Sequence, residues 1–201
     1  MRSISGKIVA AGALCAVVVG SAGFAAEKGP VPPRGAVADH VIVISIDGLR
    51  PDVIEPYRAR VLQRLMSEGA YSLDAQTVYP SKTLPSHTSM LTGVPPEVHG
   101  VTWNTDQTDR HGVVGVPTVF ELAKAQGFTT AAFFSKAKLK HLQKPGSLDH
   151  TQAPTLLDVM SAQRTVEDAT RYMQFRRPSL LFVHIAEPDA AGHSFGWLTA
   201  P

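Results

Sequence analysis

Four polar side chains in this sequence could act together in one chemical site: Asp47, Thr83, Asp189 and His193. Carboxylate and imidazole groups bind divalent metal ions such as zinc, and a hydroxyl beside such an ion becomes a usable nucleophile. The four-residue spacing of Asp189 and His193 would place both on one face of a helix. Taken singly, each residue has an ordinary structural explanation as a helix cap, a turn residue or a surface pair. Their combination favours a site, provided that the fold brings them together.

An α/β fold would bring them together. Apolar and β-branched runs predict four strands, at Val41–Ile46, Ala75–Tyr79, Thr129–Phe134 and Leu180–Ile185. Apolar residues at helical spacing predict four helices, at Tyr57–Glu68, Thr83–Thr92, Pro117–Gln126 and Thr155–Phe175. The segment His141–Pro154 is expected to form an irregular loop. Strands that alternate with helices are typical of a mostly parallel sheet flanked by helices, and ligands bind beyond the carboxyl ends of such strands.

Four segments carry a resemblance to a known family: VIVISIDG at Val41–Gly48, PSKTLPSH at Pro80–His87, Thr92-Gly93 with His99-Gly100, and EPDAAGH at Glu187–His193. In this order they resemble the type I phosphodiesterase/nucleotide pyrophosphatase family, which belongs to the alkaline phosphatase superfamily. The second and fourth segments are the most specific parts of the resemblance. It implies an alkaline-phosphatase-like α/β fold and metal-dependent hydrolysis of phosphodiester or nucleotide pyrophosphate bonds in a small-molecule substrate.

The resemblance also implies a role for each matching residue. Asp47 and Thr83 would bind one zinc ion, with Thr83 attacking phosphorus as an alkoxide, and Asp189 and His193 would bind a second zinc ion. Asn104 matches the asparagine that contacts a non-bridging phosphoryl oxygen. These roles agree with general chemistry, because a divalent cation lowers the pKa of a hydroxyl group and a helix N-terminus attracts phosphate. The ligand types favour zinc and leave manganese open.

Lys136 and Lys138 follow the predicted strand Thr129–Phe134 and admit two interpretations. A short basic segment of this kind is commonly a solvated loop. In phosphate-monoester hydrolases of the same superfamily a basic pair stands at a comparable place, and this segment resembles theirs. A monoester dianion carries one more negative charge than a diester, and lysines would neutralise it. Phosphate-monoester hydrolysis through Lys136 and Lys138 is therefore the alternative activity.

The first 25 residues have the layout of a secretory signal peptide. Two basic residues precede the uncharged run Ile8–Ala26, and Gly23 and Ala25 stand at suitable positions for cleavage. A single membrane anchor is the alternative, because a run of 19 residues is long enough to span a bilayer. We expect residues 1–25 to be removed and the protein to be secreted or periplasmic.

Composition limits the partners of the mature chain. Residues 26–38 contain several Pro and Gly and predict a linker, and residues 39–201 would form the catalytic portion. The only cysteine, Cys15, lies in the predicted leader, so no disulfide is expected. The formal net charge of +2 falls to zero without the two basic residues of the leader. No basic block indicates a nucleic-acid partner, and we expect no membrane contact beyond the leader.

The resemblance implies further metal ligands after His193, namely an Asp-His pair and a later histidine. The 201 residues contain neither after that position, and they stop before the strands expected to follow. We therefore expect the N-terminal part of a longer catalytic domain, with a fold that is incomplete at its C-terminus. We also expect little activity from these residues alone, because a catalytic zinc ion takes about three protein ligands. A truncated, non-catalytic remnant is the alternative from another class of protein.

Overall fold

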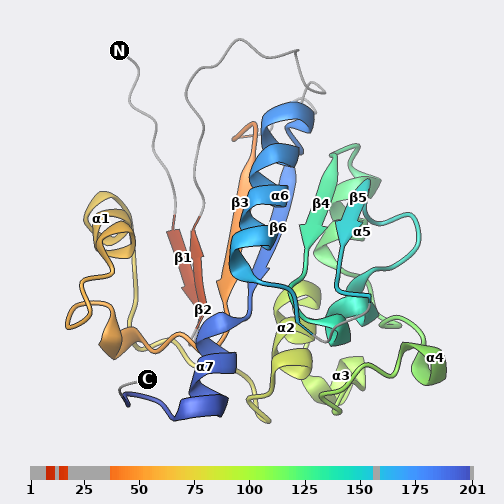
Figure 1. Ribbon diagram of the computed structural model, residues 1–201. Helices are drawn as coiled ribbons and strands as arrows, with labels where there is room; N and C mark the ends of the chain where they lie inside the picture. The colour runs from red at the N-terminus through yellow and green to blue at the C-terminus, as the bar shows by residue number, and fades with distance from the viewer. Residues whose placement is uncertain (1–7, 12–13, 18–36, 156–158, 200–201) are drawn as a thin grey trace.

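A four-stranded parallel sheet organises the described part of the chain (Figure 1). The computed structural model describes residues 8–11, 14–17, 37–155 and 159–199. The strands of this sheet are β3 (Val41–Ile46), β4 (Thr130–Phe133), β5 (His150–Gln152) and β6 (Leu180–Ile185). Their order is β3-β6-β4-β5, and every neighbouring pair is parallel. The α/β fold with a mostly parallel sheet flanked by helices is therefore confirmed.

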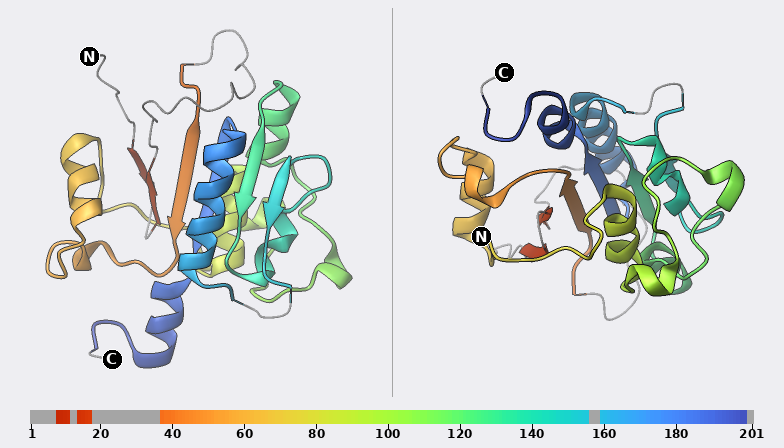
Figure 2. Two further views of the ribbon diagram at one scale, coloured as in Figure 1. Left: turned by 45° about the horizontal axis from the view of Figure 1, so that its top comes forward. Right: turned by 90° about the horizontal axis from the view of Figure 1, so that it is seen from below.

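Helices cover both faces of the sheet (Figure 2). The helices are α1 (Arg60–Glu68), α2 (Thr83–Thr92), α3 (Pro96–His99), α4 (Thr108–His111), α5 (Val119–Ala125), α6 (Ala162–Arg176) and α7 (Glu187–Phe195), with 3-10 turns η1 (Pro51–Val53) and η2 (Ala137–Leu142). One apolar cluster joins α6 to Phe133 and Val183. The other joins α2, α5 and η2 to Ala132 and Phe182. Successive side chains of β4 and β6 thus point to opposite faces of the sheet, as the geometry of a strand requires.

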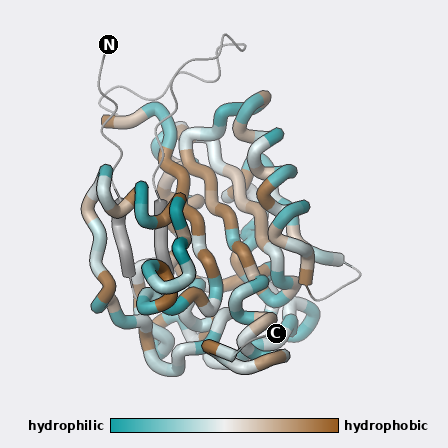
Figure 3. Tube along the Cα trace, turned by 60° about the vertical axis from the view of Figure 1, so that its left-hand side comes forward, coloured by the Kyte–Doolittle hydropathy of each residue, from teal (hydrophilic) through white to brown (hydrophobic). Residues whose placement is uncertain are grey.

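The strands in the centre of the sheet are strongly hydrophobic (Figure 3). β4 is buried at all four positions, and the four inner positions of β6 are buried as well. A strand that is covered on both faces reads as a continuous apolar run, and β6 has the bounds that the sequence predicted. β3, a partly buried strand at the sheet edge, also has its predicted bounds. The helix predicted at Thr83–Thr92 also has those bounds, as α2.

Two predictions for the connecting segments are wrong. The segment Ala75–Tyr79 is an irregular, mostly exposed connection into α2, and it is not a strand. Its β-branched and aromatic residues favour a strand only where a neighbouring strand and apolar contacts are available. Conversely, the predicted loop His141–Pro154 contains β5, which pairs with β4 in the register His150 to Ala131.

The helix predicted at Thr155–Phe175 begins only at Ala162, as α6. Ser161 is its N-cap, because the Ser161 side chain accepts a hydrogen bond from the backbone N–H of Arg164. Val159 instead forms an isolated antiparallel bridge with Lys136. The capping serine is thus the boundary signal, and Val159 and Met160 lie outside the helix.

A separate antiparallel pair, β1 (Ile8–Ala11) with β2 (Leu14–Val17), lies within the segment predicted to be a leader. The remainder of that leader and nearly all of the linker 26–38 lie outside the described residues, so both stay predictions. Within the described ranges, no helix is long and apolar enough to cross a bilayer.

Candidate active site

Asp47 and Asp189 lie together where β3 and β6 end. The two strands pair along their whole length, and the backbone N–H of Asp189 donates to the carbonyl of Asp47 at 2.9 Å. Gly48 makes this approach possible, because its φ is +74° and a Cβ there would lie 2.6 Å from the Cα of Asp189. The segments that carry Asp47 and Asp189 therefore meet in one site, as expected when two parallel strands end at the same edge of a sheet.

Thr83 reaches the same site from the first position of α2. Its Oγ1 donates to Oδ2 of Asp47 at 3.1 Å, and the residue is nearly buried. His87, one turn later, donates from Nδ1 to the Thr83 carbonyl at 2.7 Å and accepts at Nε2 from Ser45. Burial lowers the pKa of His87 to about 3, so this imidazole is neutral and holds the first turn of α2 in place.

Asn104 borders the start of α2. Its Oδ1 accepts a hydrogen bond from the backbone N–H of Leu84 at 2.9 Å. This contact fixes the orientation of the amide and leaves Nδ2, the donor end, for another acceptor. Asn104 lines a cavity of about 490 Å³ together with Asp47, Thr83, Asp189 and His193. The cavity is therefore bordered by every residue predicted as nucleophile or metal ligand.

Lys136 connects the acidic and hydroxyl groups of the site. Its Nζ lies 2.6 Å from Oδ2 of Asp47 and 3.4 Å from Oγ1 of Thr83, and it also pairs with Oδ2 of Asp189. Lys136 is only 5% exposed, so it is not part of a solvated loop. Lys138 lies in η2 and is half-buried. Neither lysine is among the residues that line the cavity, so contact of either with phosphate stays a prediction.

His193 stands on α7, one turn after Asp189. Its Nε2 lies 3.5 Å from Oδ1 of Asp189, which places both side chains on one helical face as the spacing predicts. The His193 ring contacts the Trp197 ring edge to face, with centroids 5.1 Å apart. Trp197 packs over Gly192, where a Cβ would meet the indole at 2.2 Å. The glycine of the last motif thus provides room for the indole beside the imidazole.

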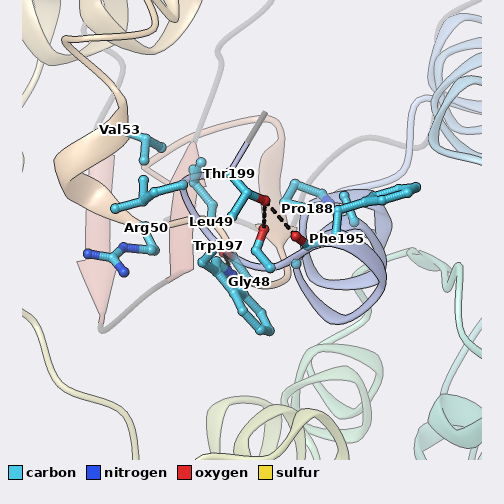
Figure 4. A pocket seen from close by; sticks show the side chains of 12 residues that line it. Gly48, Leu49, Arg50, Val53, Pro188, Phe195, Trp197 and Thr199 are labelled. Atoms are coloured by element: carbon cyan, nitrogen blue, oxygen red, sulfur yellow. Dashed lines mark hydrogen bonds between the residues drawn. The ribbon is translucent and has the colours of Figure 1, made fainter. Parts of the chain in front are cut away.

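A second, smaller cavity of about 280 Å³ adjoins the first (Figure 4). Gly48 and Trp197 line both cavities, and the indole Nε1 donates to the Gly48 carbonyl at 3.4 Å. The side chain of Thr199 turns back onto the carbonyls of Phe195 and Gly196, which closes the turn after α7. The two cavities therefore meet at Gly48 and Trp197.

The carboxyl group of Asp47 is held in its ionised form. Burial by itself raises the pKa of Asp47. The neighbouring His184 imidazole and Lys136 ammonium lower it by more than burial raises it, so the net pKa is well below the usual value. An ionised Asp47 can accept the hydrogen bond from Thr83 and can also bind a cation. The site therefore joins a nearly buried hydroxyl to a carboxylate whose surroundings favour its ionised form.

The chemistry of these donors fits divalent metal ions. Two carboxylates, a hydroxyl and an imidazole border the cavity, and zinc accepts all of these ligand types. In the described part of the chain, no group of three or more His, Cys, Asp or Glu side chains is arranged to hold an ion. The Lys136 ammonium lies between Asp47 and Asp189. The assignment of these four residues as metal ligands, and the identity and number of the ions, therefore stay predictions.

Two residues of this site were not predicted from the sequence. His184 is wholly buried, and its Nε2 lies 3.5 Å from Oδ2 of Asp47. Ser135 is also buried, and its hydroxyl contacts Nδ1 of His184 at 2.8 Å. A histidine inside the apolar run Leu180–Ile185 was the available signal, because a buried polar side chain needs a specific partner.

These observations define the class of protein. The parallel sheet flanked by helices is an alkaline-phosphatase-like α/β fold. At its edge, Thr83 at the start of α2 faces the Asp47 carboxylate beyond β3. The model of the family described as type I phosphodiesterase / nucleotide pyrophosphatase matches residues 41–201, and the chain belongs to this family.

Relatives and solved structures agree with this assignment. The chain is 25% identical over 193 residues to ectonucleotide pyrophosphatase/phosphodiesterase family member 1 from Homo sapiens, with 83% of this chain and 20% of the human protein covered. It is 29% identical over 180 residues to bis(5'-adenosyl)-triphosphatase from Xenopus laevis, covering 82% of this chain and 39% of that protein.

Murine ectonucleotide pyrophosphatase / phosphodiesterase 5 has a similar fold. The TM-score is 0.65 at 20% sequence identity, with 80% of this chain and 46% of the murine chain covered. A second structure of the murine protein is an inactive threonine-to-alanine variant in complex with AMP. The chain thus spans about a fifth of the length of its human relative and less than half of the murine structure.

Proposed function

We propose that the full protein hydrolyses phosphodiester or nucleotide pyrophosphate bonds, with Thr83 as the nucleophile. The observation that carries this proposal is the hydrogen bond of 3.1 Å from Thr83 Oγ1 to Asp47 Oδ2 at the start of α2. Family membership supports it, as does the inactive threonine-to-alanine variant of the murine relative. The nucleotide named in that complex and the activity named for the Xenopus relative support a small-molecule substrate.

The residues of this chain would perform three tasks. Thr83 presents its hydroxyl to phosphorus, and its hydrogen bond already points the proton at Asp47. Asn104 would donate from Nδ2 to a non-bridging phosphoryl oxygen, because Leu84 holds its Oδ1. The N-terminus of the ten-residue helix α2 adds partial positive charge toward the phosphoryl group. Thr83 belongs to α2, and the Leu84 N–H of the same helix orients the amide of Asn104, which lies outside that helix.

Metal ions complete the proposal. Asp47 and Thr83 would hold one divalent ion, and Asp189 with His193 would hold a second, both of them zinc by ligand type. When bound, such ions supply the charge that makes a threonine alkoxide accessible at neutral pH. The part played by this chain is to keep Asp47 ionised and to fix its distance from Thr83.

Hydrolysis of phosphate monoesters is the second candidate, and the position of Lys136 favours it. Its Nζ lies 3.4 Å from Oγ1 of Thr83, which is close enough to reach an oxygen of a phosphoryl group bound there. A monoester dianion would gain more from this ammonium than a diester monoanion. The two substrate classes can be separated by removing the lysine.

We predict that Lys136→Met in the full-length protein lowers monoester cleavage about 100-fold more than diester cleavage, if Lys136 serves the phosphate. The ratio of the two kcat/KM values is the informative quantity, because loss of the ammonium also leaves Asp47 and Asp189 less compensated. Lys138→Met tests the second lysine in the same assay.

Lys144→Met is the matched control for the lysine variants. Lys144 pairs with Glu121 at 2.8 Å and does not line the cavity. Its removal is expected to leave the ratio of monoester to diester kcat/KM unchanged. Equal losses on both substrates in Lys136→Met would remove the support for monoester hydrolysis and give Lys136 a role in holding the two carboxylates.

We also propose that the protein is exported, on the layout of its first 25 residues. The mature chain is expected to begin near Ala26 and to be found outside the cytoplasm. N-terminal sequencing of the exported protein checks this expectation, and a retained Met1 would exclude cleavage.

A further inference from the structure

His184 is a buried polar group that the proposed mechanism does not use. It lies in β6, has no exposed surface, and contacts polar atoms at both ring nitrogens. Its Nδ1 lies 2.8 Å from the Ser135 hydroxyl, and its Nε2 lies 3.5 Å from Oδ2 of Asp47. Within the described residues Nε2 has no hydrogen bond of ordinary geometry. A buried nitrogen without such a bond is costly, so its approach to Asp47 calls for an explanation.

The surroundings of the ring decide which nitrogen carries the proton. An imidazole carries a proton on Nδ1, on Nε2 or on both, and the groups that face each nitrogen favour one arrangement. Oδ2 of Asp47 already accepts from Thr83 and from Lys136, so it faces His184 as an acceptor, whereas the Ser135 hydroxyl can rotate to donate or accept. A proton on Nε2 therefore satisfies both contacts, with Ser135 donating to Nδ1. A proton on Nδ1 would instead turn a lone pair of Nε2 toward a negative charge.

We propose that His184, with its tautomer fixed by Ser135, is a positioning residue that holds the Asp47 carboxylate toward Thr83. Oδ2 of Asp47 is the oxygen that accepts from Thr83 Oγ1 and from Lys136 Nζ. A further donor at this oxygen restricts the rotation of the carboxylate beside the nucleophile. The kinetic consequences rest on the proposed function, but the tautomer of His184 does not.

A second buried pair in the same protein provides the contrast. Ser89 contacts Nε2 of His99 at 2.9 Å, and Nδ1 of His99 accepts from the backbone N–H of Val101 at 3.0 Å. Both nitrogens of His99 are therefore satisfied by structural contacts, and neither residue lines the cavity. Ser89→Ala removes the same kind of hydroxyl as Ser135→Ala without reaching Asp47, which makes it the matched control.

The first test is spectroscopic and needs no turnover. The full-length protein is labelled with ¹⁵N-histidine, and the His184 signals are assigned as those lost in His184→Gln. Two-bond ¹H–¹⁵N correlations are expected to show the Nε2–H tautomer in the parent and in Ser89→Ala. Asp47→Ala is expected to lose this preference, because the acceptor is gone. The Nδ1–H tautomer in the parent would overturn the proposal whether or not the protein cleaves phosphoesters.

The second test is kinetic. His184→Leu is expected to lower kcat for phosphoester cleavage by about 10–100-fold with little change in KM, as removal of outer partners of a ligand does. Ser135→Ala should fall at the lower end of that range, and His184→Gln should recover most of the activity because its amide N–H can replace Nε2–H. Ser89→Ala should match the parent.

The two tests together keep the inference falsifiable. Circular dichroism shows whether His184→Leu folds, and if it does not, Ser135→Ala and the tautomer in the parent decide the question. A kcat for Ser135→Ala and His184→Leu equal to that of Ser89→Ala would overturn the positioning role. A parent without any phosphoester turnover would instead reject the proposed function, while the tautomer would still report on the His184–Asp47 contact.

Discussion

Thr83→Ala is expected to lower phosphoester turnover of the full-length protein by about 10⁴-fold or more, because the attacking oxygen is lost. Thr83 is nearly buried but contributes little apolar volume, and its hydroxyl makes the hydrogen bond to Asp47. The fold should therefore persist, with a change in the free energy of unfolding of about 1 kcal/mol. Initial rates on a nitrophenyl diester and thermal unfolding of both proteins measure the two effects.

Thr83→Ser is the matched control for this variant. Serine keeps an oxygen at the first position of α2, so the hydrogen bond to Asp47 and the nucleophile both remain available. We expect a measurable fraction of the parent kcat, far above that of Thr83→Ala. An alanine variant that turns over at the parent rate would exclude Thr83 as the nucleophile.

Gly48→Ala is expected to have the second-largest effect, on both activity and stability. A Cβ at this position would lie 2.6 Å from Cα and 2.7 Å from N of Asp189, and both are backbone atoms that cannot rotate away. The clash and the positive φ together should cost about 2–4 kcal/mol of the free energy of unfolding. Displacement of Asp189 from Asp47 should lower kcat about 100-fold, because misplacement of about 1 Å has effects of this size.

Gly93→Ala separates the clash at Gly48 from backbone strain. Gly93 has a φ of +75°, almost the same as the +74° of Gly48, but a Cβ there would meet nothing within 4 Å. The control should therefore lose only about 1 kcal/mol and retain its kcat. Chemical denaturation and initial rates measure both variants. Equal losses in the two would mean that the close approach of Asp189 to Gly48 has no role in the site.

The bounds of β3 and β6 could be predicted from the sequence, whereas segments whose structure depends on tertiary contacts were predicted wrongly. β6 lies between the two helical layers, and β3 at the sheet edge is partly buried against the apolar clusters on both faces, so the bounds of both strands could be predicted from their apolar residues. The segment Ala75–Tyr79 has the composition of a strand but pairs with no strand among the described residues. Conversely, the three residues of β5 form a strand because they pair with β4. Pairing of this kind is not encoded in local composition.

The candidate site was predicted in part for the same reason. Asp47, Thr83 and Asp189 follow or begin regular elements, so the fold brings them together, and the structure places them at one cavity. Lys136 was left open because a basic residue after a strand is commonly solvated, and only its burial against two carboxylates shows otherwise. His184 was hidden in an apolar run, since its partners Ser135 and Asp47 are distant in sequence.

Trapping of a covalent intermediate tests the central claim most directly. The full-length, metal-loaded protein is mixed with excess substrate, quenched in acid during turnover, digested and mapped by mass spectrometry. The account predicts a phosphoryl or nucleotidyl adduct on the peptide that contains Thr83, and no adduct in Thr83→Ala. Sustained turnover with an adduct on another residue, or undiminished turnover by the alanine variant, would contradict it.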